Sequence, residues 1–433
     1  MKSVPNQNEA AMVATNRNRF IPFRKADIVE MCIADGRLSE PDQPSLREFC
    51  HILDSLIHFE FHRQVESLKD SYAPFNPDSD TQIVRLYSAE EKKDLQNNLV
   101  SVLTEVLNAA NFKKITETDL DEALREESLF KIRLRVDFQD FEKVIFYRRG
   151  ETNREEVLKK WFGLKKERHR FTNYERVAVY IKFKEAEYFS SKKRKPLYFT
   201  PGSTIIKLFQ NVPKADVEML FPNSEVRMKT IDKLIIGIPA AVSGAVVVAT
   251  KLGASILLIA SAVSFWLGLT DQEVVIEQNH LIALAAGLAT LGGFLIRQVN
   301  KFKNRKIKYM KALSENLYFK NLDNNAGVFH HLIDAAEEEE FKEAVLAYYF
   351  LLTEDRDLTI AELDGAIENW FEKAHQCLID FEIEDAVDKL VRWGLVDRIG
   401  AKLRSIPLKA AKQKIDAIWD DLFSYHKTGA SLK

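Results

Sequence analysis

Two apolar stretches dominate the hydropathy pattern of the chain. The first runs from Leu234 to Leu269 with Lys251 as its single charged residue, and the second runs from Leu281 to Ile296 without any charge. A helix that crosses a membrane needs roughly 20 apolar residues, within a range of about 17 to 25, so the first stretch is too long for one span. The pattern therefore predicts a membrane segment over residues 234–299, and the number of crossings has to come from the flanking charges.

The charges around the two stretches favour two crossings. Lys and Arg residues precede the first stretch and follow the second, whereas residues 270–280 between them contain three acids and no Lys or Arg. Lys and Arg near the ends of spans stay on the cytoplasmic side, and two spans place both basic flanks there, whereas three spans do not. We expect a two-helix transmembrane hairpin with spans at about 250–269 and 280–298. Both flanking parts of the chain then face the cytoplasm, or the matrix of an organelle.

Three kinds of residue in this segment are candidates for a role at the membrane. The predicted anchors at the membrane surfaces are Lys251, Trp266 and Arg297. In the alternative placement Lys251 lies near the middle of the bilayer, at a cost of about 2.5 to 3.5 kcal/mol. Small residues at helical spacing predict a packing seam, within the hairpin or in a homo-oligomer: Gly237, Ala241, Ala245, Ala249, Gly253, Ala285, Ala289 and Gly293. A basic cluster after the second span predicts contact with anionic lipid headgroups: Lys301, Lys303, Arg305, Lys306 and Lys308.

The rest of the chain alternates between two periods. Apolar residues recur at helical spacing within 46–61 and 95–107, which predicts amphipathic helices in an acidic region over residues 19–130. From residue 131 the period changes to two, which predicts a small, basic, antiparallel β-rich domain over 131–233. Residues 1–18 lack both patterns and are interpreted as a disordered leader. The expected fold class is an α+β membrane protein in which these regions surround the transmembrane hairpin.

The C-terminal part predicts a basic juxtamembrane segment and helix over 300–352, followed by a winged-helix-like domain over 353–433. A helix over 382–393, a glycine cap at Gly394 and two short strands around 399–402 support the second assignment. The four glutamates at 337–340 are interpreted as the solvated face of the preceding helix. Winged helices can bind DNA, and residues 389–414 are locally basic. However, residues 312–433 carry a net charge of -10, which disfavours nucleic acid as a partner.

Composition adds bounds to this picture. The chain has 433 residues, 46% hydrophobic and 29% charged, as expected for an ordered protein of about two to four domains. Its cysteines, Cys32, Cys50 and Cys377, form no pair motif and predict free thiols. His58 and His62 lie one helical turn apart, but no third ligand and no known catalytic motif accompanies them. The sequence therefore predicts no catalytic residue, metal or cofactor.

Several strings in the sequence resemble a known family. They are RFIPFRKADIVEM, HFEFHRQVESLKDSYAPFNPD, VDFQDFEKVIFYRRG, KLFQNVPKADVEMLFPNSEVRM and NLYFKNLDNNAGVFHHLIDAAEEEEFKEAVLAYYFL. In this order they resemble the domain-of-unknown-function family that includes mitochondrial transmembrane protein 143 and bacterial relatives, over residues 19–352. The resemblance implies two transmembrane helices and a membrane location, and it implies no reaction. It also marks a candidate signature: Asn321, Leu322, Asp323, Asn324, Asn325 and Gly327. A capped turn before a helix near Val328 is the alternative interpretation of these residues.

The functional expectation is a membrane-anchored scaffold or adaptor without enzymatic activity. Its expected partners are anionic membrane lipids and a protein partner or a second copy. The expected location is a bacterial inner membrane, with the mitochondrial inner membrane as the alternative. A membrane-tethered winged-helix regulator that contacts DNA, and an unrecognised enzyme, are the alternative functions.

Overall fold

The computed structural model describes residues 17–160, apart from 83, 117, 121 and 123–132, and residues 165–190, 199–227, 242–269 and 277–423. The chain divides into two compact units. The first, here called the core unit, contains Met1–Arg125, Phe138–Val217 and Lys320–Lys433. The second, here called the inserted unit, contains Glu126–Asp137 and Glu218–Phe319. The chain leaves the core unit after Val217 and returns to it at Lys320, so the segments on both sides of the long insertion belong to the core unit.

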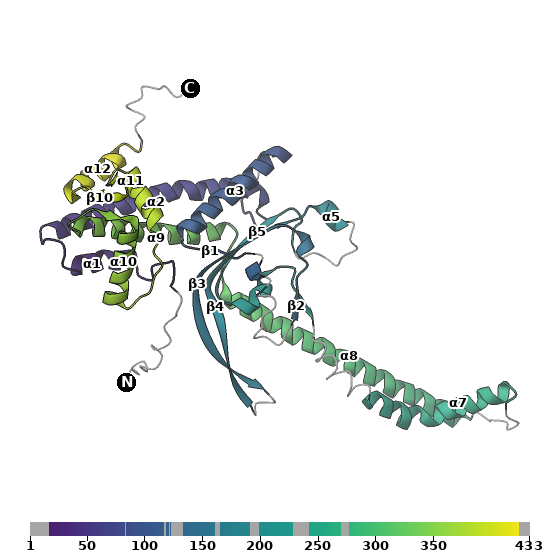
Figure 1. Ribbon diagram of the computed structural model, residues 1–433. Helices are drawn as coiled ribbons and strands as arrows, with labels where there is room; N and C mark the ends of the chain where they lie inside the picture. The colour runs from purple at the N-terminus through teal and green to yellow at the C-terminus, as the bar shows by residue number, and fades with distance from the viewer. Residues whose placement is uncertain are drawn as a thin grey trace, which may run out of the picture. The chain divides into compact units, whose positions relative to one another are not determined.

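Seven longer helices build most of the core unit (Figure 1). They are α1 (Lys25–Ala34), α2 (Asp42–Tyr72), α3 (Ala89–Ala109), α9 (Ala326–Thr353), α10 (Ile360–His375), α11 (Ile383–Arg392) and α12 (Leu408–Asp420). α2 and α3 confirm the amphipathic helices predicted within 46–61 and 95–107. α3 begins with a capping box, in which Ser88 and Glu91 each accept a hydrogen bond from the other's backbone N–H. Short helical turns lie at η1 (Ala73–Phe75), η2 (Phe138–Asp140), α5 (Ala186–Ser190) and η4 (Lys214–Leu220).

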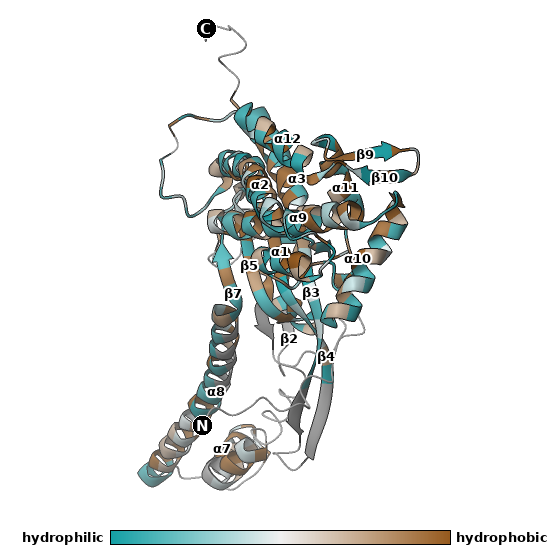
Figure 2. Cartoon of the chain, turned by 90° about the vertical axis from the view of Figure 1, so that its left-hand side faces the viewer, coloured by the Kyte–Doolittle hydropathy of each residue, from teal (hydrophilic) through white to brown (hydrophobic). Residues whose placement is uncertain are grey.

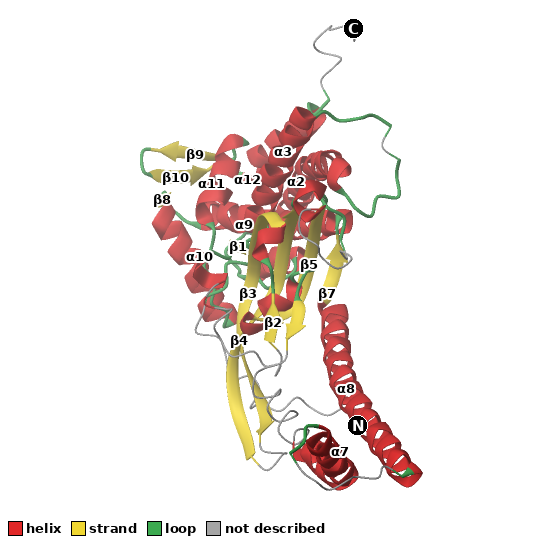
Figure 3. Cartoon of the chain, turned by 90° about the vertical axis from the view of Figure 1, so that its right-hand side faces the viewer, coloured by secondary structure: helices red, strands yellow, loops and turns green. Residues whose placement is uncertain are grey.

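A five-stranded antiparallel sheet completes the core unit (Figure 3). Its order is β1 (Lys113–Lys114), β3 (Phe141–Lys160), β4 (Lys165–Phe183), β5 (Thr204–Pro213) and β7 (Asn321–Asn324). β3 and β4 stay paired as far as Lys160 and Lys165, whereas β5 follows β4 only to Asn173, so their outer half is a two-stranded ribbon. The antiparallel β-region predicted from residue 131 is thus confirmed, but its edge strand β7 comes from beyond the apolar stretches.

The C-terminal residues contain the elements predicted for them. α11 is followed by Gly394, which has a φ of 66°. β9 (Val396–Ile399) and β10 (Lys402–Ser405) then form a hairpin, and β8 (Leu358–Thr359) adds a third strand on the side of β10. Because only a residue that tolerates positive φ ends the helix in this way, Gly394 is the expected cap.

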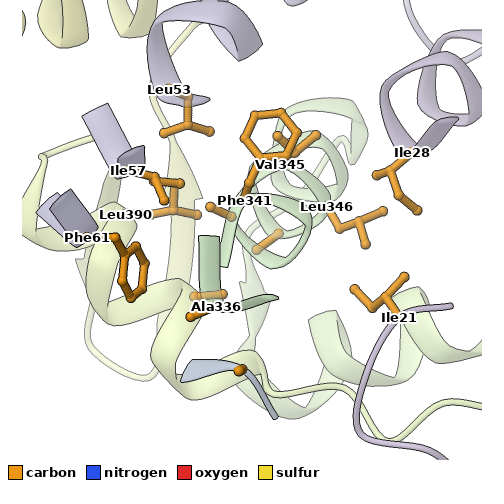
Figure 4. Packing of buried hydrophobic residues seen from close by; sticks show 14 of the residues in the cluster. Ile21, Ile28, Leu53, Ile57, Phe61, Ala336, Phe341, Val345, Leu346 and Leu390 are labelled. Carbon is orange, nitrogen blue, oxygen red and sulfur yellow. The ribbon is translucent and has the colours of Figure 1, made fainter. Parts of the chain in front are cut away.

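One core cluster joins these parts around α9. α9 packs against α1, α2, α3, α10 and α11. Figure 4 shows Ile21 and Ile28 near Leu346 on one side of α9, and Leu53 and Leu390 on the other. N-terminal and C-terminal helices therefore share one hydrophobic interior.

The inserted unit contains the apolar stretches. Residues 242–247 are helical and lead into a π-helical turn, η5 (Val248–Leu252), and into α7 (Gly253–Trp266). α8 (Gln278–Lys320) is a single helix of 43 residues. β2 (Arg133–Arg135) and β6 (Glu225–Arg227) pair in the same unit.

Two membrane-spanning helices were predicted, and the structure contains one helix that meets the length and hydropathy of a span. Within the described residues, Gln278–Lys301 is the one helix long and apolar enough to cross a membrane. α7 has 14 residues, which corresponds to about 21 Å at 1.5 Å per residue, less than the roughly 30 Å of a hydrocarbon core. The π-helical turn that contains Lys251 separates α7 from the helical residues before it.

Candidate functional site

The apolar part of α8 is exposed in this structure. The segment Gln278–Lys301 has 24 residues and contains an 18-residue apolar window with a mean hydropathy of 1.6, of which only 6% is buried. Figure 2 shows apolar positions along α7 and α8. On α8, Leu281, Leu288 and Leu295 are all more than half exposed. An exposed apolar surface of this extent is typical of a site that contacts a membrane or another protein.

The predicted anchors and basic cluster lie along these helices. Trp266, 92% exposed, is the last residue of α7, and Arg297 is exposed within the apolar window of α8. Lys251 belongs to the π-helical turn, and its side chain lies outside the description. Of the basic cluster, Lys301, Lys303 and Lys308 are exposed on α8, whereas the side chains of Arg305 and Lys306 are not described. Their contact with lipid stays a prediction.

The packing seam also stays a prediction. Gly237 and Ala241 lie outside the described residues. A Cβ built at Gly253 or at Gly293 would have open space around it, whereas one built at Gly244 would lie 3.4 Å from Cε1 of Phe294. Gly244, one residue away from the predicted row, thus lies close to Phe294 of α8.

The candidate signature lies where α8, the sheet edge and α9 follow one another. α8 ends at Lys320, and β7 occupies Asn321–Asn324 and pairs with β5. Asn325 then adopts φ 53° and ψ -127°, a conformation that residues with a side chain rarely adopt. The alternative interpretation as a simple capped turn is thus incomplete, because four of the six residues form an edge strand.

Hydrogen bonds from three distant parts of the chain hold Asn325 in place. Its backbone N–H donates to the Ile206 carbonyl at 2.6 Å, and its Oδ1 accepts from the Ile206 N–H at 3.2 Å. The Tyr72 hydroxyl lies 2.9 Å from the same Oδ1 and 2.8 Å from the Thr204 carbonyl oxygen. The Asn325 Nδ2 donates to Asp78 at 2.6 Å. Burial raises the pKa of Tyr72, which keeps this hydroxyl a donor at neutral pH.

Gly327 is required by its neighbour Asp323. A Cβ at Gly327 would collide with the Asp323 carboxylate, which accepts from the Asn324 N–H at 2.7 Å and lies 3.3 Å from His331 Nε2. Glycine at this position thus lets the Asp323 side chain fold over the start of α9. The contact is structural, and it gives the signature no reactive group.

The glutamate run at 337–340 is not a solvated face, which corrects the prediction. Glu339 is 2% exposed and Glu340 is 8% exposed. Glu339 accepts from Lys342 Nζ at 2.9 Å and from the backbone N–H of Ile21 at 2.9 Å. Because other segments cover nearly all of the second half of α9, the charged positions there face protein, and each needs a partner.

Glu343 is the third buried carboxyl group of α9. It is 3% exposed, and its Oε1 accepts from Asn111 Nδ2 at 2.7 Å. Burial, together with the charges of Glu340 and Glu339, raises the pKa of Glu343 well above its ordinary value. Of the three carboxyl groups, Glu339 pairs with Lys342 and Glu340 pairs with Lys389. Burial therefore disfavours the ionised form of Glu343.

Many of the basic residues that suggested DNA binding form ion pairs within the core unit. Bidentate contacts join Arg404 to Asp357 at 2.7 Å and Arg392 to Glu60 at 3.1 Å. Further pairs are Lys389 with Glu340, Arg398 with Asp388, and Lys412 with Glu48. The exposed positions of α11 are Glu384, Asp385, Asp388 and Arg392. This helix thus presents a mainly acidic face, which repels phosphate.

The histidine and cysteine positions suggest no metal chemistry. In the part of the chain that the structure describes, no group of three His, Cys, Asp or Glu residues could hold a metal ion. His58 Nδ1 lies 3.0 Å from Glu337, and His58 and His62 line an open surface hollow beside Trp419. The cysteines are free, as predicted, with Cys32 and Cys50 buried.

Sequence reasoning missed the partners of the signature and of the glutamates. Thr204, Ile206 and Asn111 carried no signal, whereas Tyr72 and Lys342 stood within strings that were noticed only as resemblances. Two of these strings, SYAPFNPD and NLDNNAG, meet in the core unit, where Tyr72 and Asp78 contact Asn325. The string RFIPFRK contacts α9 instead, through Ile21.

Comparison with known proteins gives one family. A family model described as a protein of unknown function (DUF3754) matches residues 174–327. The matched segment begins in β4 at Tyr174 and ends at Gly327, so it includes β5, α7, α8 and the signature. The chain is similar to that family over this segment. No solved structure matches the chain.

Proposed function

We propose that the protein is an integral membrane protein that works as a scaffold or adaptor. The observation that carries the proposal is the exposed apolar window Gln278–Lys301 of α8. At 1.5 Å per residue, 24 residues extend over about 36 Å, enough to cross the hydrocarbon core. α8 continues beyond this window through the basic cluster and ends at Lys320.

Two crossings fit the fold better than one. β5 before the insertion pairs with β7 after it, and α2 packs against α9. A single crossing between residues 217 and 320 would place these partners on opposite sides of the bilayer. An even number of crossings keeps them together, which favours a second passage through the helical residues 242–266.

A second passage would include the π-helical turn. Residues 242–247, η5 and α7 follow one another without a break, and Gly244 lies close to Phe294 of α8. π-helical turns inside helices are rare and often functional. We place Lys251 of this turn in the inner half of the passage with its side chain extended toward the inner headgroups, because a charge at the centre of the bilayer is costly.

The charges favour one side of the membrane for the core unit, and the resemblance favours a particular membrane. Lys and Arg flank the insertion, whereas residues 270–280 have none, which favours the core unit on the cytoplasmic or matrix side. The basic cluster would then meet anionic headgroups. The resemblance to the family of mitochondrial transmembrane protein 143 and its bacterial relatives favours an inner membrane, bacterial or mitochondrial.

The core unit favours binding over catalysis. A cavity between α3 and the sheet, lined by Leu103, Tyr147 and Tyr180, has about 10 Å³, room for one water molecule. The winged-helix-like elements favour a protein contact, because the outer face of α11 is acidic. DNA binding by this module is the weaker candidate for the same reason.

Labelling of single cysteines tests the topology. A membrane-impermeant thiol reagent, applied to intact cells or to intact mitochondria without an outer membrane, should react with a cysteine placed at Gln278. Cysteines placed at Ser190 and Ser314 should react only after the membrane is permeabilised. Reaction at exactly one of the two, Ser190 or Ser314, in intact membranes would rule out the two-crossing proposal. Release of the protein by alkaline carbonate would rule out the membrane anchor itself.

A further inference from the structure

Residues 17–24, here called the strap, cross the core unit in an extended form before α1 begins. Within the strap, the sequence Arg-Asn-Arg-Phe-Ile-Pro-Phe-Arg forms no helix, and a parallel bridge joins Asn18 to Ile379. The Asn18 carbonyl also accepts from the Asp380 N–H at 2.9 Å. The strap is therefore held as a bound peptide is held, by contacts to other segments.

A buried ion pair on α9 binds the main chain of the strap. Glu339 accepts from the Ile21 N–H at 2.9 Å, and Lys342 Nζ donates to the Ile21 carbonyl at 2.8 Å and to the Phe23 carbonyl at 3.2 Å. Lys342 is 1% exposed. A buried charge pair is costly unless further hydrogen bonds satisfy it, and here the strap provides them.

Side chains of the strap fit the same surface. Ile21 is 2% exposed and belongs to the hydrophobic core (Figure 4). The Phe23 ring stacks on Phe371 with centroids 5.8 Å apart, and the Arg149 guanidinium lies 5.3 Å from the centre of the Phe20 ring. The seat of the strap is defined here as Arg149, Glu339, Lys342, Glu368, Phe371 and Glu382.

Charge complementarity supplements these contacts. Arg17 pairs with Glu368, and Arg19 pairs with Glu382. Asp364 and Asp380 add further negative charge, and burial together with Glu368 and Asp380 raises the pKa of Asp364 to about 6. The seat thus carries an excess of negative charge that two arginines of the strap offset.

We propose that the seat is a docking site for an extended segment with alternating arginines followed by Phe-Ile-Pro-Phe, and that its partner is the strap of a second copy. In this structure the chain's own strap occupies the site. A second copy presents the same segment with the same arginine spacing, so exchange between copies replaces every contact by an identical one. If the seat were empty, the Glu339–Lys342 pair would lose its hydrogen bonds to the main chain of the strap. A seat filled by the strap of a second copy is therefore favoured over an empty seat.

Peptide binding to the full-length protein in detergent micelles tests the site. The probe is a fluorescent peptide of residues 15–25. Wild type should bind it weakly, because its own strap competes at a high effective concentration. The variant Arg17→Glu/Arg19→Glu, whose changes are exposed or half-exposed, should bind it about tenfold more tightly. A peptide with Ile21→Glu is the matched control and should not bind. Equal binding of both peptides, or no binding to either protein at about 1 mM, would overturn the site.

A cross-linking experiment tests the second copy. One tagged chain carries Arg17→Cys and the other carries Glu368→Cys, and the two are mixed in the same micelles or membrane. A covalent dimer between the two tags is expected under mild oxidation and should be absent when either change is missing. Peptide binding without such a dimer would overturn the second copy as the partner. Both readouts are independent of the number of membrane crossings.

Discussion

Two long helices that lie on either side of β7 in the chain, α8 and α9, have opposite environments. α9 is enclosed by helices and strands from both ends of the sequence, whereas the apolar window of α8 is 6% buried. α9 nevertheless carries buried Glu339, Glu340, Lys342 and Glu343, while residues 281–296 of α8 carry no charge. The difference shows that apolar content alone does not decide what a helix packs against. A helix inside a protein can keep charges because other segments supply partners, and a helix in lipid cannot.

The largest expected effect concerns the charges inside α9. Lys342→Met removes the partner of Glu339 and leaves a carboxylate buried without compensation. We expect the free energy of unfolding to decrease by about 3 to 5 kcal/mol, measured by denaturant titration in micelles. The double variant with Glu339→Gln should recover part of the loss. A loss below about 1 kcal/mol for Lys342→Met would mean that this pair is not needed for the enclosed helix.

The converse change places a charge on α8. Leu288→Arg lies within the apolar window and should cost about 2.5 to 3.5 kcal/mol for membrane insertion. The measured result is a smaller fraction of protein that resists carbonate extraction. Ile307→Arg, on the same helix beyond the window and also exposed, is the matched control and should insert normally. Equal behaviour of the two variants would contradict a lipid environment for the window.

Glu343 gives the folded protein a pH-dependent stability. Because its pKa is raised in the folded state, the folded protein keeps a proton that the unfolded chain releases above about pH 4.3. The free energy of unfolding therefore decreases as pH rises from that value toward the raised pKa, by at most about 1.4 kcal/mol per pH unit. Glu343→Gln should remove this slope, so the melting temperature of the variant should rise relative to that of wild type as the pH increases from 5 to 9. Near pH 4 the two proteins should have the same melting temperature. If their melting temperatures change in parallel with pH over the whole range, the raised pKa of Glu343 is contradicted.

The smallest effect concerns the contact within the inserted unit. Gly244→Val adds two methyl groups and a Cβ beside Phe294, and overpacking of this kind costs about 1 kcal/mol. Gly293→Val meets open space and serves as the control. A lower melting temperature for the first variant alone is expected. Equal melting of both would show that the helical residues 242–247 do not pack closely on α8.

Local patterns in the sequence predicted local elements. The apolar positions of α2 and α3 repeat at helical spacing because one face of each helix packs on the core, and Gly394 marked the end of α11. α9 was harder to interpret, because nearly all of its second half is buried and polar residues no longer mark an outer face. Its glutamates looked solvated because one of their partners, Ile21, lies 318 residues earlier in the chain.

For the candidate sites as well, the sequence predicted only what depends on a local pattern. The apolar window and the basic cluster could be predicted from the sequence, since each depends on the composition of one continuous stretch. The Asn325 junction was visible only as a resemblance, because its geometry depends on Tyr72, Asp78 and Ile206, which no spacing connects to it. The seat of the strap had no sequence signal, since a main chain bound by a buried ion pair leaves no pattern in side chains.

The position of the insertion also has a consequence for synthesis. The ribosome finishes α1, α2, α3 and β5 before it makes α9, and roughly 100 residues of insertion separate β5 from β7. At about 5 to 20 residues per second, the first half of the core unit waits on the order of 5 to 20 seconds for its central helix. During this time Leu46, Leu53 and Leu99, which end fully buried, have no α9 to cover them. Under the proposed membrane insertion, delivery of the apolar stretches to the insertion machinery thus falls within the interval in which the nascent chain depends most on chaperones.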